Sequence, residues 1–122
     1  MEPLKKIAVS VVSDDGASAL VDVHFGRAPF FVVVNVESPD TAEIISNEIA
    51  RSVQGAGSRT ASLLISRGVT DVVSGQYGPK AAEVLEKQAV RMWMAPSGLT
   101  AEVIVDALGK GELNRFQMRV YK

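Results

Sequence analysis

Apolar residues along the chain occur in short runs, separated by turns that contain glycine or several polar residues. In the first half these runs are Ile7–Val12, Pro29–Val36 and a weaker one at Thr41–Ile49. Short runs rich in β-branched residues are typical of strands. Pro29–Val36 is apolar at nearly every position, which predicts a strand covered on both faces. We therefore predict antiparallel strands here, with the third run pairing back in a hairpin or meander.

The stretch Leu20–Phe25 has a different pattern, because apolar and other residues alternate along it. In an extended backbone, successive side chains point to opposite faces. We therefore predict a further strand in which Asp22 and His24 share one face and the apolar side chains share the other.

The second half alternates between strand-like and helix-like segments. The predicted strands are Thr70–Gly75 and Val90–Ala95, and the predicted helices are Ser58–Arg67, Gly78–Gln88 and Thr100–Leu108. Glycine after a helix and proline at its first position mark several of these boundaries. Strands separated by single helices favour parallel neighbours with right-handed crossovers. The pattern as a whole predicts an α/β fold, a mixed sheet with helices packed on it.

The length of 122 residues suits one domain, with a core over about residues 7–113. With 47% hydrophobic and 22% charged residues, the composition is that of an ordinary globular protein. The last residues, 114–122, fit a short strand, an extension or a frayed end equally well.

Charge and cysteine content exclude several classes of function. The net charge of −1 and the pI of about 5.8 argue against a protein that coats nucleic acid. The absence of cysteine excludes disulfides, thiolate zinc sites and thiolate-held iron–sulfur clusters. No apolar stretch has the length of a signal peptide or of a membrane helix. We therefore expect a cytoplasmic protein with no membrane association.

Three glycine-containing turns precede the predicted helices, at Gln54–Ser58, Ser74–Pro79 and Ala95–Thr100. The last two directly follow strands, so they are expected at the carboxyl edge of the sheet, where α/β proteins usually bind ligands. Helix N-termini there favour anions, although turns of this kind also need glycine for geometry alone. The candidate anion-binding residues are Gly55, Gly57, Ser58, Gly75 and Gly78.

His24 is the only histidine of the chain, and its neighbours make it a candidate ligand. Asp22 would lie on the same face of the predicted strand, where it can orient the imidazole. Gly26 permits a turn, and Arg27 would place a planar cation beside the ring. A neutral imidazole binds iron well. The alternative is a histidine at a strand end that only bonds a turn carbonyl.

Motifs of common enzymes are missing. Asp14, Asp15, Asp22 and Asp71 would have to meet in space to form a two-metal nuclease site, but aspartate in a turn has local reasons to be there. No GxSxG nucleophile elbow occurs. We therefore expect a protein that is not an enzyme.

The motifs "VDVHFGRAPFFVVVNVE", "GAG", "SGQYGPKA" and "GEL" occur in this order along the chain. Together they resemble the dinitrogenase iron–molybdenum cofactor biosynthesis family, over about Ile7–Leu113. The resemblance implies a ribonuclease-H-like mixed α/β sheet. It also implies a protein that binds or carries iron–sulfur cofactor precursors or the finished iron–molybdenum cofactor, with a cluster donor or acceptor protein as partner.

By this resemblance His24 is the candidate metal ligand, with Arg27 beside it and Asp22 orienting the imidazole. Backbone N–H groups near Gly55–Ser58 and Gly75–Gly78 would neutralise the charge of a transiently bound cluster.

Two departures from the family pattern bear on this prediction. Gln54 stands where many relatives have histidine, and some relatives have cysteine where this chain has none. The alternative is therefore a metal-free interaction module that binds a protein partner or a small organic anion.

Overall fold

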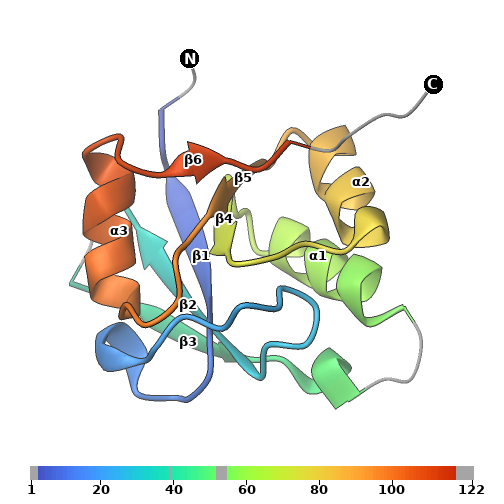
Figure 1. Ribbon diagram of the computed structural model, residues 1–122, viewed down its shortest axis with the longest axis horizontal. Helices are drawn as coiled ribbons and strands as arrows, with labels where there is room; N and C mark the ends of the chain where they lie inside the picture. Colours follow the sequence, from blue (N-terminus) through green and yellow to red (C-terminus); the bar gives the residue numbers. More distant parts are fainter. Residues whose placement is uncertain (1–2, 39, 52–54, 118–122) are drawn as a thin grey trace.

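The computed structural model describes residues 3–38, 40–51 and 55–117. Its strands are β1 (Lys6–Val11), β2 (Phe30–Asn35), β3 (Glu43–Ser46), β4 (Asp71–Ser74), β5 (Arg91–Met94) and β6 (Asn114–Arg115). Its helices are α1 (Ala56–Ser66), α2 (Pro79–Lys87) and α3 (Ala101–Gly109), with two short 3₁₀ helices, η1 (Gly16–Ser18) and η2 (Glu48–Arg51). Figure 1 shows α1 and α2 on one side of the sheet and α3 on the other.

The strands of the described residues form one mixed sheet in the order β3-β2-β1-β4-β5-β6. β1, β2 and β3 pair in antiparallel fashion, whereas β1, β4 and β5 are parallel neighbours. Ala8 of β1 faces Val33 on one side and Val72 on the other, so β1 joins the two halves. This arrangement confirms the predicted antiparallel first half and the parallel strands of the second half.

Side chains from β2 enter the core on both faces of the sheet. Phe31 and Val33 pack in the cluster under α1 and α2, while Val32 and Val34 pack in the cluster under α3. Burying an aliphatic or aromatic side chain of this size contributes about 1.5–3 kcal/mol. The predicted burial of this strand on both faces is therefore confirmed.

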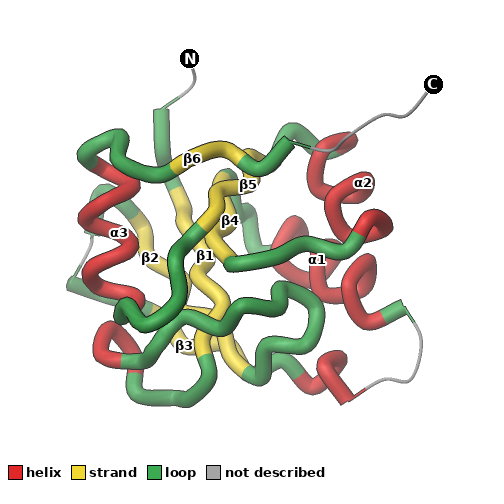
Figure 2. Tube along the Cα trace, viewed as in Figure 1, coloured by secondary structure: helices red, strands yellow, loops and turns green. Residues whose placement is uncertain are grey.

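The predicted strand at Leu20–Phe25 is wrong. This segment is mostly loop (Figure 2), and Val23 is 40% exposed although Phe25 is buried. Its backbone makes only isolated bridges to three different parts of the chain, so a continuous ladder cannot form. The bridges are Val21 with Val11, Leu20 with Thr100, and His24 with Gln76.

Helix α1 begins at Ala56, two residues earlier than predicted. Gly55 precedes it with a φ of 71°, a left-handed conformation that glycine adopts without strain. In the tail, Asn114–Arg115 pair with β5 as a strand, and residues 118–122 lie outside the described part of the chain. The finer expectation of a ribonuclease-H-like fold stays a prediction. None of the helices among the described residues is long and apolar enough to span a membrane.

A buried charged group lies at the amino end of β4. The carboxylate of Asp71 accepts hydrogen bonds from the Arg91 guanidinium (2.9 Å), the Trp93 indole N–H (2.8 Å) and the Thr70 hydroxyl (2.8 Å). Asp71 is fully buried, and the Arg91 side chain is 13% exposed. The Asp71 carboxylate thus holds β4 and β5 together. It lies at the end of β4 that is opposite to the loop containing Asp22.

Tyr77 is a buried tyrosine whose single hydroxyl hydrogen is shared between the carbonyls of Trp93 (2.8 Å) and Val72 (3.1 Å). Burial raises the pKa of this hydroxyl well above its usual value of about 10. The folded state therefore favours the neutral hydroxyl. The contribution of this buried tyrosine to the free energy of unfolding is complete below pH 10 and is lost as the pH rises further.

We expect the free energy of unfolding of the native protein to fall above pH 10 more steeply than that of Tyr77→Phe. The two proteins differ because Tyr77 ionises above pH 10 in the unfolded chain but stays neutral in the folded one. The difference between their free energies of unfolding grows by about 1.4 kcal/mol per pH unit. Urea unfolding of both proteins between pH 8 and pH 11 measures it. Parallel curves for the two proteins would contradict the assignment to Tyr77.

Candidate functional site

The segment that carries His24 crosses the carboxyl ends of β1 and β4. In Figure 1 it is the light-blue loop that runs between η1 and β2, below the connection that leads into α2. Three backbone N–H groups fix it to three separate elements. They are Val21 donating to Leu99 (2.9 Å), Asp22 donating to Ser10 (2.8 Å) and Phe25 donating to Gln76 (3.1 Å).

Glycines allow this segment to lie directly against its neighbours. A Cβ atom added to Gly26 would lie 2.7 Å from the Cα atom of Gly57, in the first turn of α1. One added to Gly75 would lie 2.9 Å from the Cα atom of Val23. Real Cβ atoms do not come so close to backbone, so both contacts require glycine. The glycines that the sequence offered as ligand contacts thus also hold the loop in place.

A pocket of about 400 Å³ lies between this loop and the N-termini of α1 and α2. It brings together seven of the nine predicted site residues: His24, Gly26, Arg27, Gly55, Gly57, Ser58 and Gly78. Asp22 and Gly75 do not line it. Asp22 is part of the loop and is bonded to β1 through its backbone N–H, and Gly75 packs on Val23 of the loop.

The imidazole of His24 is accessible, with 60% of the side chain exposed. Asp22 contacts His24 in two ways: Oδ1 accepts the backbone N–H of His24 at 2.9 Å, and it lies 3.8 Å from Nδ1 of the ring. The short bond therefore stabilises the turn of the loop. The longer contact leaves the ring free to bind a ligand in the pocket.

Arg27 borders the pocket on the side of η2. Its Nη1 donates to the carbonyl of Ala50 at 2.9 Å, which ties the loop to this 3₁₀ helix. Arg27 lines both the pocket and a neighbouring hollow beside Pro29 and Asn47. Its charge is therefore held at the rim of the pocket.

Both helix N-termini at the pocket have glycine at the N-cap position, Gly55 for α1 and Gly78 for α2. Glycine has no side chain that could accept a bond from the first N–H groups of the helix. In α3, which lies away from the pocket, Thr100 supplies this bond to the N–H of Val103. The first N–H groups of α1, and those of α2 that follow Pro79, which itself has no N–H, therefore receive no bond from an N-cap side chain and can face an anionic ligand.

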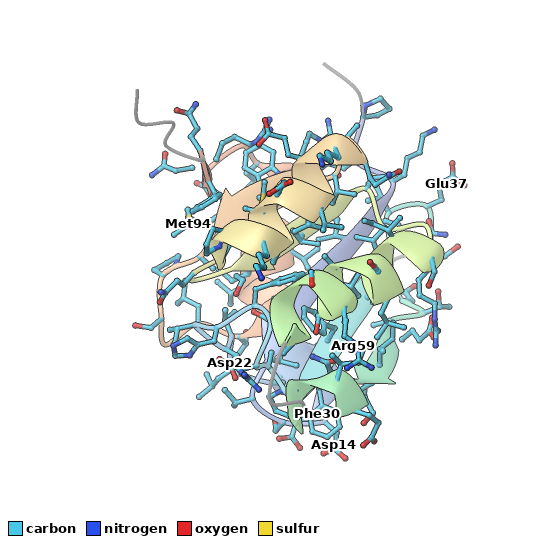
Figure 3. All side chains as sticks on the ribbon, turned by 90° about the vertical axis from the view of Figure 1, so that its right-hand side faces the viewer. Asp14, Asp22, Phe30, Glu37, Arg59 and Met94 are labelled. Carbon is cyan, nitrogen blue, oxygen red and sulfur yellow. The ribbon has the colours of Figure 1, made fainter. Side chains whose placement is uncertain are left out.

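The charged residues in the first helical turns also favour an anionic ligand. Stability alone favours acidic residues at a helix N-terminus, and α3 has Glu102 there. In α1 and α2 the first turn contains no acidic residue, and it carries Arg59 and Lys80 instead. Figure 3 looks onto these two helices, with Arg59 and Asp22 labelled in its lower half. Of these two, Lys80 lines the pocket, and a cation at this helix N-terminus is explained if an anion binds there.

Lys80 and Gln76 line the pocket, and the sequence analysis did not single them out. The signal for Lys80 was present, since a lysine directly after Gly78 and Pro79 opposes the helix dipole. Gln76 had no such signal, because it acts through its backbone, whose carbonyl accepts the N–H of Phe25. Gln54 lies outside the described residues.

The described residues contain no group of three or more histidine, cysteine, aspartate or glutamate side chains that could enclose a metal ion. The described part of the pocket lining has three basic side chains, His24, Arg27 and Lys80, and no carboxylate. The arrangement therefore favours a ligand that is itself negatively charged.

The family model for the dinitrogenase iron–molybdenum cofactor matches residues 5–111 of the chain. The chain belongs to the dinitrogenase iron–molybdenum cofactor family. This membership confirms the resemblance seen in the sequence motifs.

One relative and two solved structures are similar to the chain over most of its length. The uncharacterised protein MJ0580 of Methanocaldococcus jannaschii is 31% identical over 96 residues, which are 77% of this chain and 80% of that protein. The apo form of the orange protein from Desulfovibrio gigas has a TM-score of 0.87 at 30% identity, covering 95% of this chain and 96% of that one. An NMR structure of a candidate NifB protein from Thermotoga, in the DUF35 family, has a TM-score of 0.82 at 27% identity, covering 98% and 99%.

Proposed function

We propose that this protein binds an anionic metal–sulfur cluster of the iron–molybdenum cofactor type, or a precursor of it, and carries it without chemical conversion. The observation that carries the proposal is the pocket where one accessible imidazole, two helix N-termini without side-chain caps and Lys80 converge. His24 supplies the bond to metal. The N–H groups of α1 and α2, with Lys80 and Arg27, compensate the negative charge of the cluster.

A preformed cluster suits this set of residues better than a single metal ion does. A lone iron or zinc ion needs three or four protein ligands, and the described residues offer no such group. A cluster brings its own sulfides, so one imidazole and a positively charged surround are sufficient to hold it. The pocket volume lies within the range of about 300–1,000 Å³ typical of small-molecule sites.

Family membership and the structural neighbours support the same cargo. The family is described by the dinitrogenase iron–molybdenum cofactor, and one neighbour was described as a candidate NifB protein. The orange protein structure is called its apo form, a term for a protein without its bound group. An exposed histidine as the single metal ligand favours release as well as binding. A carrier of this kind exchanges its cargo with a donor or acceptor protein.

We expect isolated iron–molybdenum cofactor, added anaerobically, to bind the native protein and to bind His24→Ala at least tenfold more weakly, because the metal bond is lost. Lys80→Ala should weaken binding about fivefold through the loss of one charge contact (about 1 kcal/mol). Gel filtration with iron and molybdenum analysis measures bound cofactor, and electron paramagnetic resonance reports its environment.

Lys87→Ala is the matched control, because it removes a lysine from the other end of α2, where it pairs with Glu83. It should bind like the native protein. Equal binding by all four proteins would place the cofactor elsewhere. If the native protein binds no cofactor but binds an organic anion independently of His24, the metal-free interaction module replaces this proposal.

A further inference from the structure

The two faces of the sheet are covered unequally. α1 and α2 lie on one face, whereas α3 lies alone on the other, near β1 (Figure 1). Neighbouring residues of β3 show the effect: Ile45, on the side of α1 and α2, is 5% exposed, and Ile44, on the side of α3, is 42% exposed. The sheet therefore has an open strip over β3 beside α3, whereas Val32 and Val34 of the neighbouring β2 are only 1% and 7% exposed.

A groove of about 460 Å³ follows this strip. Val32 and Val34 of β2 form its floor, Val105 of α3 forms one wall, and Ala42 before β3 lies on the other side. Ile44 pairs with Val32 in the sheet and points to the same face. Six of the nine residues that line the groove are apolar.

The three polar residues of the groove are all acidic: Asp40, Glu102 and Asp106. No lysine, arginine or histidine is found among its described lining residues. Glu102 and Asp106 are one turn apart on α3, and like charges at this spacing destabilise a helix slightly. Asp106 also pairs with Lys110 at 2.9 Å, but both side chains are more than 60% exposed. Glu102 also lies in the first turn of α3, where the helix dipole favours an acidic residue. Together with Asp40, these side chains give the groove a negatively charged rim.

We propose that this groove binds a basic amphipathic helix of a partner protein. An apolar floor between acidic walls fits a helix with one apolar stripe flanked by lysine or arginine. Bound beside α3, that helix gives the open face the two-helix cover that the other face already has. α3 has nine residues and is about 14 Å long, so the groove accepts two to three helical turns.

The groove and the cofactor pocket belong to different parts of the molecule. The groove is formed by β2, α3 and their neighbours, whereas the pocket is formed by the His24 loop, α1 and α2. A partner can therefore dock in the groove while the pocket stays accessible. This inference does not depend on what the pocket binds.

The test uses the full chain and a synthetic 14-residue amphipathic helix with leucine on one face and lysine on the other. Its counterpart has glutamate in place of lysine. Backbone amide shifts in NMR titrations locate the bound peptide and give its affinity. We expect the lysine peptide to shift amides of α3, β2 and β3. The double variant Glu102→Gln/Asp106→Asn should bind it about fivefold more weakly, because two charge contacts are lost. The glutamate peptide should not bind.

The control variant is Glu83→Gln/Glu86→Gln, which removes two acidic residues from α2 on the other face. It should bind the lysine peptide like the native protein. Equal weakening in both double variants, or shifts spread over the whole surface, would overturn the proposal in favour of unspecific attraction. A native chain that forms dimers in sedimentation equilibrium, and loses them in Ile44→Asp, would also overturn it, since the groove would then bind a second copy.

Discussion

We expect Gly26→Ala to lower the free energy of unfolding by about 3 kcal/mol and to weaken cofactor binding together with it. The added Cβ would lie 2.7 Å from the Cα atom and 3.0 Å from the N atom of Gly57, which are both backbone atoms. Flexible side chains can move aside, but here the loop or the first turn of α1 has to shift. Overfilling a packed site in this way costs about 1–3 kcal/mol, and the shift moves the neighbouring His24 relative to α1.

Gly78→Ala is the matched control, since Gly78 lines the same pocket. A Cβ added there meets no atom within 4 Å, and its φ of −70° suits alanine. The small loss at a helix N-cap and the gain from a less flexible unfolded chain, each about 0.5–1 kcal/mol, offset each other. Urea unfolding and cofactor titration of both variants give the comparison. If Gly26→Ala is as stable as Gly78→Ala, the close approach of the loop to α1 is wrong.

Asp71→Ala should be the most destabilising substitution in the sheet, by about 3–5 kcal/mol, a fall in Tm of about 10–20 °C. The substitution takes the carboxylate away from the largely buried Arg91 guanidinium and removes the acceptor of the Trp93 indole N–H. A buried charge that loses its counter-charge costs far more than an exposed one, because water cannot replace the contact.

Glu43→Gln provides the comparison for Asp71, because Glu43 also pairs with an arginine at 2.9 Å. That pair, with Arg67, has both side chains about half exposed. Its loss should change the free energy of unfolding by no more than about 0.5 kcal/mol. Thermal unfolding followed by circular dichroism measures both variants. Similar Tm values for the two would show that the Asp71 pair contributes no more than a surface pair.

The fold could be predicted from the sequence largely because burial in this sheet follows its periodicity. The apolar run from Phe30 to Val34 predicts a strand buried on both faces, and glycines follow α1 and α3, whereas Ala89 takes the left-handed position after α2. The loop at Leu20–Phe25 could not be predicted in this way. Its alternation is that of a strand, but its hydrogen-bond partners lie on three elements that are distant in sequence.

For the site, the sequence indicated the residues but not the reasons for them. Glycine-containing turns before helices predicted an anion site at the carboxyl edge, and the pocket brings most of those residues together. The sequence could not predict the packing of Gly26 on Gly57 or of Gly75 on Val23. Both contacts depend on the three-dimensional path of the loop. Lys80 could have been found by asking why a cation occupies a position that the helix dipole disfavours.

The way the loop is fixed also sets when the pocket can form during synthesis on the ribosome. The residues of the His24 loop are translated early, but the residues that hold the loop in place are translated much later. These are Gln76, which accepts a hydrogen bond from Phe25, and Leu99, which accepts one from Val21. An emerging chain that ends before Leu99 therefore has the histidine but lacks one of the bonds that holds its loop. The pocket, with all the bonds that hold its loop, is therefore complete only in a nearly finished polypeptide.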